Sequence, residues 1–135
     1  MYRRFRRVAN FYVVYIAEAH AVDGWQTDSN EAGGIRIPQP VVFAERWAAA
    51  ERCAEALGLS IPTLVDGMDD AARTAFAAWP ERIFVFDRGG RLAYMGGPGP
   101  YGFKPDEGQA ALIDVLAADA GPLHPRSARG TMPRG

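Results

Sequence analysis

A carboxylate and an imidazole follow an apolar segment near the start of the chain. Glu18 and His20 stand two residues apart, just after the run FYVVYI at residues 11–16. That run is continuously apolar and β-branched, and it is too short for a buried helix, so it predicts a central strand covered on both faces. Ligands and chemistry in open α/β sheets collect beyond the carboxyl ends of such strands. The position of Glu18 and His20 therefore indicates a functional site.

Two further side chains lie just beyond this pair. Asp23 follows the same predicted strand. Trp25 lies in residues 23–40, a segment that is dense in turn-forming residues. Long loops over the carboxyl end of a sheet are often functional. We expect Trp25, an aromatic side chain on a loop, to contact a ligand.

Composition limits the class of protein. The chain has 135 residues, of which 48% are hydrophobic and 23% charged, which is the size and make-up of one globular domain. The net charge of −1 gives no reason to expect a nucleic-acid partner. The FYVVYI run spans six residues, too few for a membrane span or a signal peptide, so we expect a soluble, cytoplasmic protein.

The titratable residues outside this region indicate structural roles. Cys53, the single cysteine, excludes an internal disulfide and a multi-cysteine zinc site, and its mid-helix position indicates an inert thiol. Asp66, Asp69 and Asp70 stand between a strand and a helix, where aspartates commonly bind free N–H groups at the helix start. We expect Asp69 or Asp70 to cap that helix, and no metal site.

The periodicity of the chain predicts an alternation of helices and strands. The expected elements are the end of a helix at residues 1–9, a strand at 11–16, a helix at 41–57, a strand at 61–66, a helix at 71–79, an antiparallel hairpin at 82–87 and 91–95, and a helix at 105–119. Trp47 and Trp79 are predicted to be core residues. Residues 1–120 form the expected domain, and residues 121–135 are expected to be a disordered tail.

This order is that of an α/β, thioredoxin-like (peroxiredoxin-related) sheet with flanking helices, with the first central strand missing. In that fold a cis-proline at the mouth of the penultimate strand shapes the wall of the site. Pro80 stands at this place, so we expect it to contribute to substrate binding, although a trans bond is also compatible with the sequence.

Four segments carry a resemblance to a known family: YIAEAHAVDGW, IPTLVDGMDDAA, FAAWPERIFVFD and YMGGPGPYGF. Together they resemble the iodothyronine deiodinases and their bacterial relatives, from about residue 3 to residue 117. The resemblance implies reductive dehalogenation, in which a selenocysteine or cysteine attacks the iodine of a small iodinated aromatic and is then reduced by thiols. The expected electron donor is a thioredoxin- or glutathione-type thiol, with no bound cofactor.

The resemblance also assigns roles to the residues. Glu18 and His20 match the catalytic residues near the nucleophile, where a histidine can deliver a proton to the developing carbanion. Asp23 and Trp25 would shape the mouth of the same pocket. Two positions depart from the family pattern, since Pro40 replaces a histidine and Pro98 replaces an arginine thought to hold the hormone.

The nucleophile of the family is expected before Tyr2, so it would lie outside this chain, and the chain alone is expected to be inactive. A selenocysteine codon read as a stop would explain a start inside the first helix, which favours a selenoprotein. The missing strand would leave two open sheet edges, through which the chain could dimerise. Two alternatives remain, a non-catalytic thioredoxin-like binding module and a redoxin that acts on peroxides or disulfides.

Overall fold

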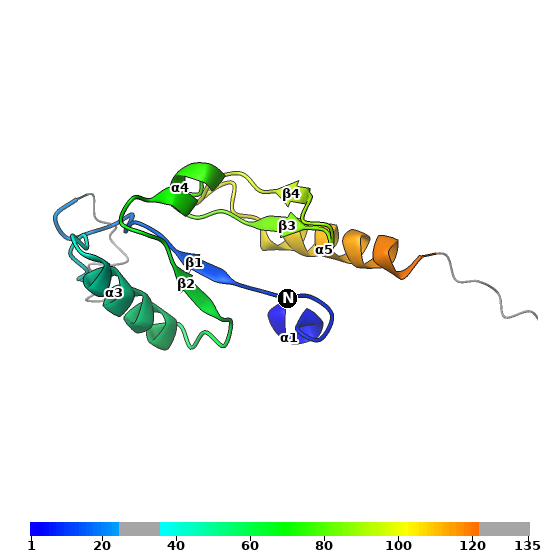
Figure 1. Ribbon diagram of the computed structural model, residues 1–135, viewed down its shortest axis with the longest axis horizontal. Coiled ribbons are helices and arrows are strands. Elements are labelled where there is room, and N and C mark those ends of the chain that lie inside the picture. Colours follow the sequence, from blue (N-terminus) through cyan, green and yellow to red (C-terminus); the bar gives the residue numbers. More distant parts are fainter. Residues whose placement is uncertain (25–35, 122–135) are drawn as a thin grey trace, which may run out of the picture.

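Two short sheets organise the described part of the chain, which comprises residues 1–24 and 36–121 of the computed structural model. The strands are β1 (Val13–Tyr15) and β2 (Thr63–Val65), which pair in parallel, and β3 (Phe84–Phe86) and β4 (Leu92–Met95), which form an antiparallel hairpin. Figure 1 shows β1 and β2 running side by side next to α3, and the hairpin lying along α5.

The helices follow the predicted order. They are α1 (Tyr2–Phe5), α3 (Phe43–Ala56), α4 (Ala71–Phe76) and α5 (Pro105–Ala120). The predicted strands and helices are therefore confirmed in type, with shorter strands than expected. Helix α4 ends at Phe76 rather than residue 79, because Ala77 adopts a left-handed conformation with φ of 45°.

The α/β class is confirmed, whereas the thioredoxin-like arrangement stays a prediction. The described strands form two separate two-stranded sheets rather than one sheet. Within residues 1–24 and 36–121, β1 pairs only with β2 and β3 only with β4. The predicted tail lies outside the described residues, except for Gly121.

The largest apolar cluster joins the start of the chain to the hairpin. Phe5, Val85 and Leu112 are its buried members, and Phe11 and Tyr94 pack against them. The segment that leads into β1 is thereby fixed against β3, β4 and α5. The chain buries the aromatic rings of this cluster without making a continuous sheet from β1 to β3.

Helix α3 buries its alanines and not its tryptophan. Trp47 is 47% exposed, whereas Ala49 and Ala50 are almost fully buried. Trp79 is 46% exposed, so the prediction that both tryptophans are core residues was wrong. The small alanine side chains let α3 approach β2 closely, and Arg46 on the same face is only 3% exposed.

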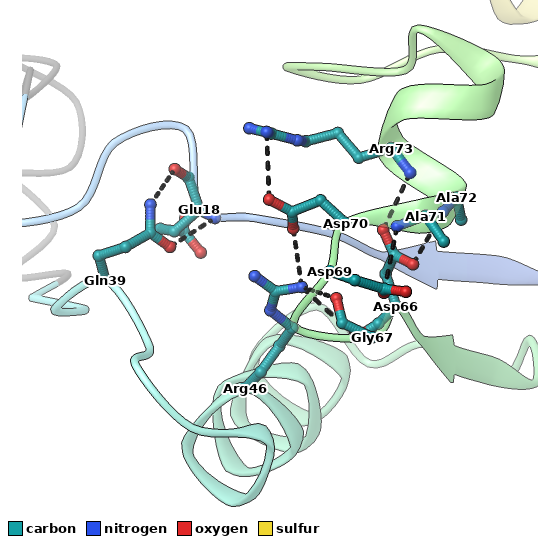
Figure 2. A network of polar contacts seen from close by, with 10 residues as sticks. All are labelled: Glu18, Gln39, Arg46, Asp66, Gly67, Asp69, Asp70, Ala71, Ala72 and Arg73. Atoms are coloured by element: carbon teal, nitrogen blue, oxygen red, sulfur yellow. Dashed lines mark hydrogen bonds and ion pairs between the residues drawn. The ribbon is translucent and has the colours of Figure 1, made fainter.

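Arg46 is buried, and one nitrogen of its guanidinium group meets carbonyl and carboxylate oxygens (Figure 2). Its Nη1 donates to the carbonyl of Gly67 and lies 2.9 Å from Asp70 Oδ1. Arg73 binds the other carboxylate oxygen of Asp70 at 3.1 Å. This Arg46–Asp70–Arg73 network joins α3, the end of β2 and the start of α4, and it holds Asp70 in a left-handed conformation with φ of 53°.

Asp66, one of the three aspartates that the sequence places before α4, supplies most of the cap of this helix. The N–H groups of Ala72 and Arg73 each donate to an Asp66 carboxylate oxygen at 2.9 Å. Asp69 accepts the Ala71 N–H at 3.4 Å, and the Asp70 side chain forms no capping bond. The expected cap by Asp69 or Asp70 is therefore present only as the long Asp69 bond, and the two shorter bonds go to Asp66.

Two opposing effects set the pKa of Asp66. Burial raises the pKa, but the N–H bonds from Arg73 and Ala72, together with the charge of Arg46, outweigh it, so the pKa of the carboxyl lies below its usual value. Asp66 therefore remains charged over the ordinary pH range.

Loss of Arg46 should strongly destabilise the chain. We expect Arg46→Met to lower the free energy of unfolding by about 3 kcal/mol, because Asp70 and the carbonyls of Asp66 and Gly67 would lose their buried partner. Urea unfolding followed by circular dichroism measures this. Arg52→Met, an equal change at an exposed position of α3, should cost less than about 0.5 kcal/mol, and equal losses for the two variants would contradict the network.

The Asp66 cap should produce a pH-dependent stability. We expect Asp66→Ala to cost about 2 kcal/mol at neutral pH. Because the folded pKa lies below the ordinary value of 3.8, the stabilisation is present above that value and disappears as the pH falls through the folded pKa. The free energies of unfolding of Asp66→Ala and of the wild type should therefore approach one another as the pH is lowered from neutral to acid. A difference that does not depend on pH would show that the charged Asp66 carboxylate is not the source of the stabilisation. Asp69→Ala is the control.

Candidate active site

The carboxyl end of β1 places a tyrosine against a carboxylate. The hydroxyl of Tyr15 donates a short hydrogen bond to Glu18 Oε2, and both side chains are half-buried. Burial is the main cause that raises the pKa of Tyr15 far above its ordinary value, followed by the hydrogen bond to Glu18 and the charge of Glu18. The phenol therefore stays protonated at neutral pH and acts as a donor to Glu18.

The backbone of Glu18 is held by the side chain of Gln39. The Glu18 N–H donates to Gln39 Oε1 at 3.1 Å, and Gln39 Nε2 donates to the Glu18 carbonyl at 3.1 Å, as Figure 2 shows. The N–H of Gln39 in turn donates to Asp23 Oδ1 at 3.1 Å. The structure thus brings Glu18 and Asp23, two of the predicted site residues, into one hydrogen-bonded unit.

The other predicted site residues take different positions. His20 is half-buried, two residues beyond Glu18 in the same segment, and Asp23 is exposed. Trp25 lies outside the described residues. Pro80 follows a cis peptide bond before β3, but it takes no part in the hydrogen bonds that join Glu18, Gln39 and Asp23.

An open hollow lies beside Gln39. It has a volume of about 360 Å³ and is bounded by residues of the 38–41 segment and of α3. Its lining residues are Pro38, Gln39, Pro40, Val41, Glu45, Ala48, Ala49 and Arg52. Its wall is mostly apolar and includes the polar residues Gln39, Glu45 and Arg52.

The thiol of Cys53 faces the same electrostatic environment. Burial raises the pKa of Cys53, and the charge of Glu18 raises it further. A thiol with a raised pKa is largely protonated at neutral pH and is a poor nucleophile. The environment agrees with the inert role that the sequence predicts.

The described residues provide proton donors and acceptors rather than metal ligands. No group of three or more His, Cys, Asp or Glu residues that could hold a metal ion occurs in residues 1–24 and 36–121. None of the helices described here combines the length and the apolar character needed to cross a membrane. The end of β1 thus holds a carboxylate that is paired with a phenol, and His20 follows two residues after Glu18.

A family comparison assigns the chain. Residues 1–115 match the model of the iodothyronine deiodinase family. The chain belongs to the iodothyronine deiodinase family. It is 36% identical to the type I iodothyronine deiodinase of Xenopus laevis over 103 residues, which are 76% of this chain and 38% of the relative.

Other deiodinases are similarly related. The type II iodothyronine deiodinase of Petromyzon marinus is 34% identical over 86% of this chain and 39% of its own length. The thyroxine 5-deiodinase of Sparus aurata is 37% identical over 74% of this chain and 36% of its own length. The chain thus spans little more than a third of the deiodinases it matches.

Sequence reasoning missed two residues of this deiodinase-family site. Tyr15 was counted only as part of the strand, although its spacing of three residues from Glu18 at a strand end could have suggested the contact. Gln39 stands between two prolines and carries no charge, so nothing in the local pattern marked it. Its partner is the peptide of Glu18, and such a backbone contact leaves no residue-type signature.

The charge of Glu18 should control the reactivity of Cys53. We expect Glu18→Gln to lower the pKa of the Cys53 thiol, because a negative charge near the thiolate is removed, while burial still keeps the value above normal. The rate of alkylation by a neutral reagent as a function of pH measures the shift. Glu51→Gln, an exposed change on α3, should leave the profile in place, and an identical shift would show that Glu18 is not responsible.

Proposed function

We propose that this chain supplies the proton-donating part of a reductive deiodination site. Its substrate would be a small iodinated aromatic of the thyroxine type. The observation that carries the proposal is the Tyr15–Glu18 hydrogen bond at the end of β1, in a chain of the deiodinase family. In this assignment Glu18 and His20 are catalytic, and Asp23, Trp25 and Pro80 contribute to the substrate site.

The proposed reaction balances with two thiols. A thiolate or selenolate attacks the iodine, so that a sulfur–iodine or selenium–iodine bond forms while the carbon–iodine bond breaks. The aryl carbanion takes its proton from His20, which regains it from solvent, while Glu18 lies two residues before His20 in the same segment. Two reductant thiols then release iodide, regenerate the nucleophile and leave as a disulfide, while the aromatic product has gained hydrogen in place of iodine.

The nucleophile is proposed to be a group outside the 135 residues. Cys53 is the only cysteine, and its raised pKa makes it unsuitable for attack. The proposed donors are thioredoxin- or glutathione-type thiols, which are maintained in reducing compartments, and we therefore propose a cytoplasmic location.

Iodide release tests this function. The 135-residue chain with dithiothreitol and an iodinated phenol should release no iodide. A chimera should be active when the part of the Xenopus laevis type I deiodinase that precedes its aligned region is joined to Met1. In that chimera we expect His20→Ala to lower the rate at least about tenfold, which is the usual minimum for loss of a general acid.

Matched variants make the assay decisive. His124→Ala changes the other histidine of the sequence and should leave the rate unchanged. A folded chimera without iodide release would overturn the proposed function. Iodide release by the 135-residue chain that disappears in Cys53→Ser would instead place the nucleophile on Cys53.

A second candidate function, a non-catalytic binding module, rests on the sheet edges. Among the described residues, β1 and β3 each pair along one edge, and an open edge can accept a strand of another chain. Dimerisation through such an edge is part of this alternative. Analytical ultracentrifugation separates the two candidates, since a stable dimer combined with an inactive chimera would favour the binding module.

A further inference from the structure

The segment that carries Glu18 leaves the sheet before it reaches Glu18. The last bond between the β1 and β2 strands of the described structure runs from the Asp66 N–H to the Tyr15 carbonyl, at 2.9 Å. Beyond Tyr15 the strand has no neighbour in its own sheet to fix its path. The position of the Glu18 carboxylate therefore depends on contacts from elsewhere.

The side chain of Gln39 supplies those contacts, and it makes the same pair of hydrogen bonds to the Glu18 backbone that a neighbouring strand would make. Its carboxamide accepts the Glu18 N–H and donates to the Glu18 carbonyl, both at 3.1 Å. A side-chain amide carries the same donor and acceptor as a peptide group, so this pair of bonds satisfies both backbone groups of Glu18. The strand exit is thus extended by a side chain instead of by a third strand.

Gln39 is itself held firmly. Pro38 and Pro40 fix their own φ angles and restrict the residue before each of them to extended conformations, which leaves Gln39 little freedom. Its N–H donates to Asp23 Oδ1 at 3.1 Å, and the neighbouring Ile37 carbonyl accepts the Val22 N–H at 2.9 Å. Residues 37–39 therefore bind both ends of the 18–23 segment.

We propose that Gln39 is a positioning residue that holds Glu18 beneath the Tyr15 hydroxyl and fixes the segment that carries His20. This role deepens the proposed deiodinase function and rests on it for its catalytic meaning. Gln39 acts through the Glu18 peptide rather than on the substrate. Its effect on a reaction would be to keep the proton-donating groups in one arrangement.

The chemistry of the contact explains why the residue is glutamine. Glutamate at this position could accept the Glu18 N–H but would present a second acceptor to the Glu18 carbonyl. Methionine has a similar length and can form neither of the two bonds. Asparagine has both groups but is one methylene shorter, so it cannot reach the same peptide from the Gln39 backbone position.

Nuclear magnetic resonance on the full 135-residue chain tests the contact without any assay of activity. We expect Gln39→Met to raise the hydrogen-exchange rate of the Glu18 amide at least about tenfold, as loss of a hydrogen bond worth about 1.4 kcal/mol would, whereas Gln39→Glu keeps an acceptor for this N–H and should raise the rate less. The amides of Val85 and Leu112, in the apolar cluster, should keep their rates. The ring resonances of Tyr15 should shift at neutral pH in Gln39→Met, because Glu18 no longer holds a fixed position as acceptor of the Tyr15 hydroxyl.

Gln109→Met is the matched control. Gln109 is half-buried on α5 and its side chain forms no hydrogen bond in the described structure, so its replacement should change neither the Glu18 amide nor the Tyr15 resonances. An unchanged Glu18 exchange rate and unchanged Tyr15 resonances in Gln39→Met would overturn the positioning role. Faster exchange at Val85 and Leu112 as well would show general destabilisation and would also overturn it.

Kinetics of the chimera separate this inference from the proposed function. In an active chimera Gln39→Met should lower kcat at least about tenfold and change KM less than about twofold, since a positioning residue acts on the transition state. Normal kcat would overturn the inference while leaving the proposed function in place. A folded chimera that is inactive with Gln39 intact would overturn the function, and the resonance experiment would still decide whether Gln39 positions Glu18.

Discussion

The parallel pairing of β1 with β2 is the constraint on which the rest of the site depends. Parallel strands end at the same edge, so Tyr15 and Asp66 emerge as neighbours, joined by the Asp66 N–H bond to the Tyr15 carbonyl. The two strand ends then serve different purposes. The exit of β2 binds α3 and α4 through Arg46 and Asp66, and the exit of β1 carries Glu18 and His20.

The ends of β1 and β2 also differ in the groups that surround their carboxylates. At the β2 exit, cations and N–H groups surround the carboxylates, so the pKa of Asp66 falls despite burial. At the β1 exit, Glu18 has a phenol as its partner, and the pKa values of Tyr15 and Cys53 rise. The first arrangement stabilises a fixed negative charge, whereas the second keeps Tyr15 and Cys53 protonated at neutral pH.

The sequence predicted the order of elements well because that order depends on local signals. The six-residue apolar run, the alanine-rich helix and the hairpin glycines each determine their own segment, and Gly90 adopts the positive φ of 78° that a tight turn requires. Burial was predicted less well. Periodicity marked Trp47 as a core residue, but the buried face of α3 is decided by the acceptors around Arg46, which come from a distant segment.

The candidate site shows the same division. Glu18, His20 and Asp23 could be found from their types and from their place after a strand, and the structure joins Glu18 to Asp23 through Gln39. Tyr15 could be found only from its spacing to Glu18, and Gln39 not at all, because each matters through a partner and not through its own residue type. Gln39 in particular binds a peptide group, which every residue has. A single sequence reveals the groups that could do chemistry. The groups that hold them in place are found only from the path of the backbone in the structure.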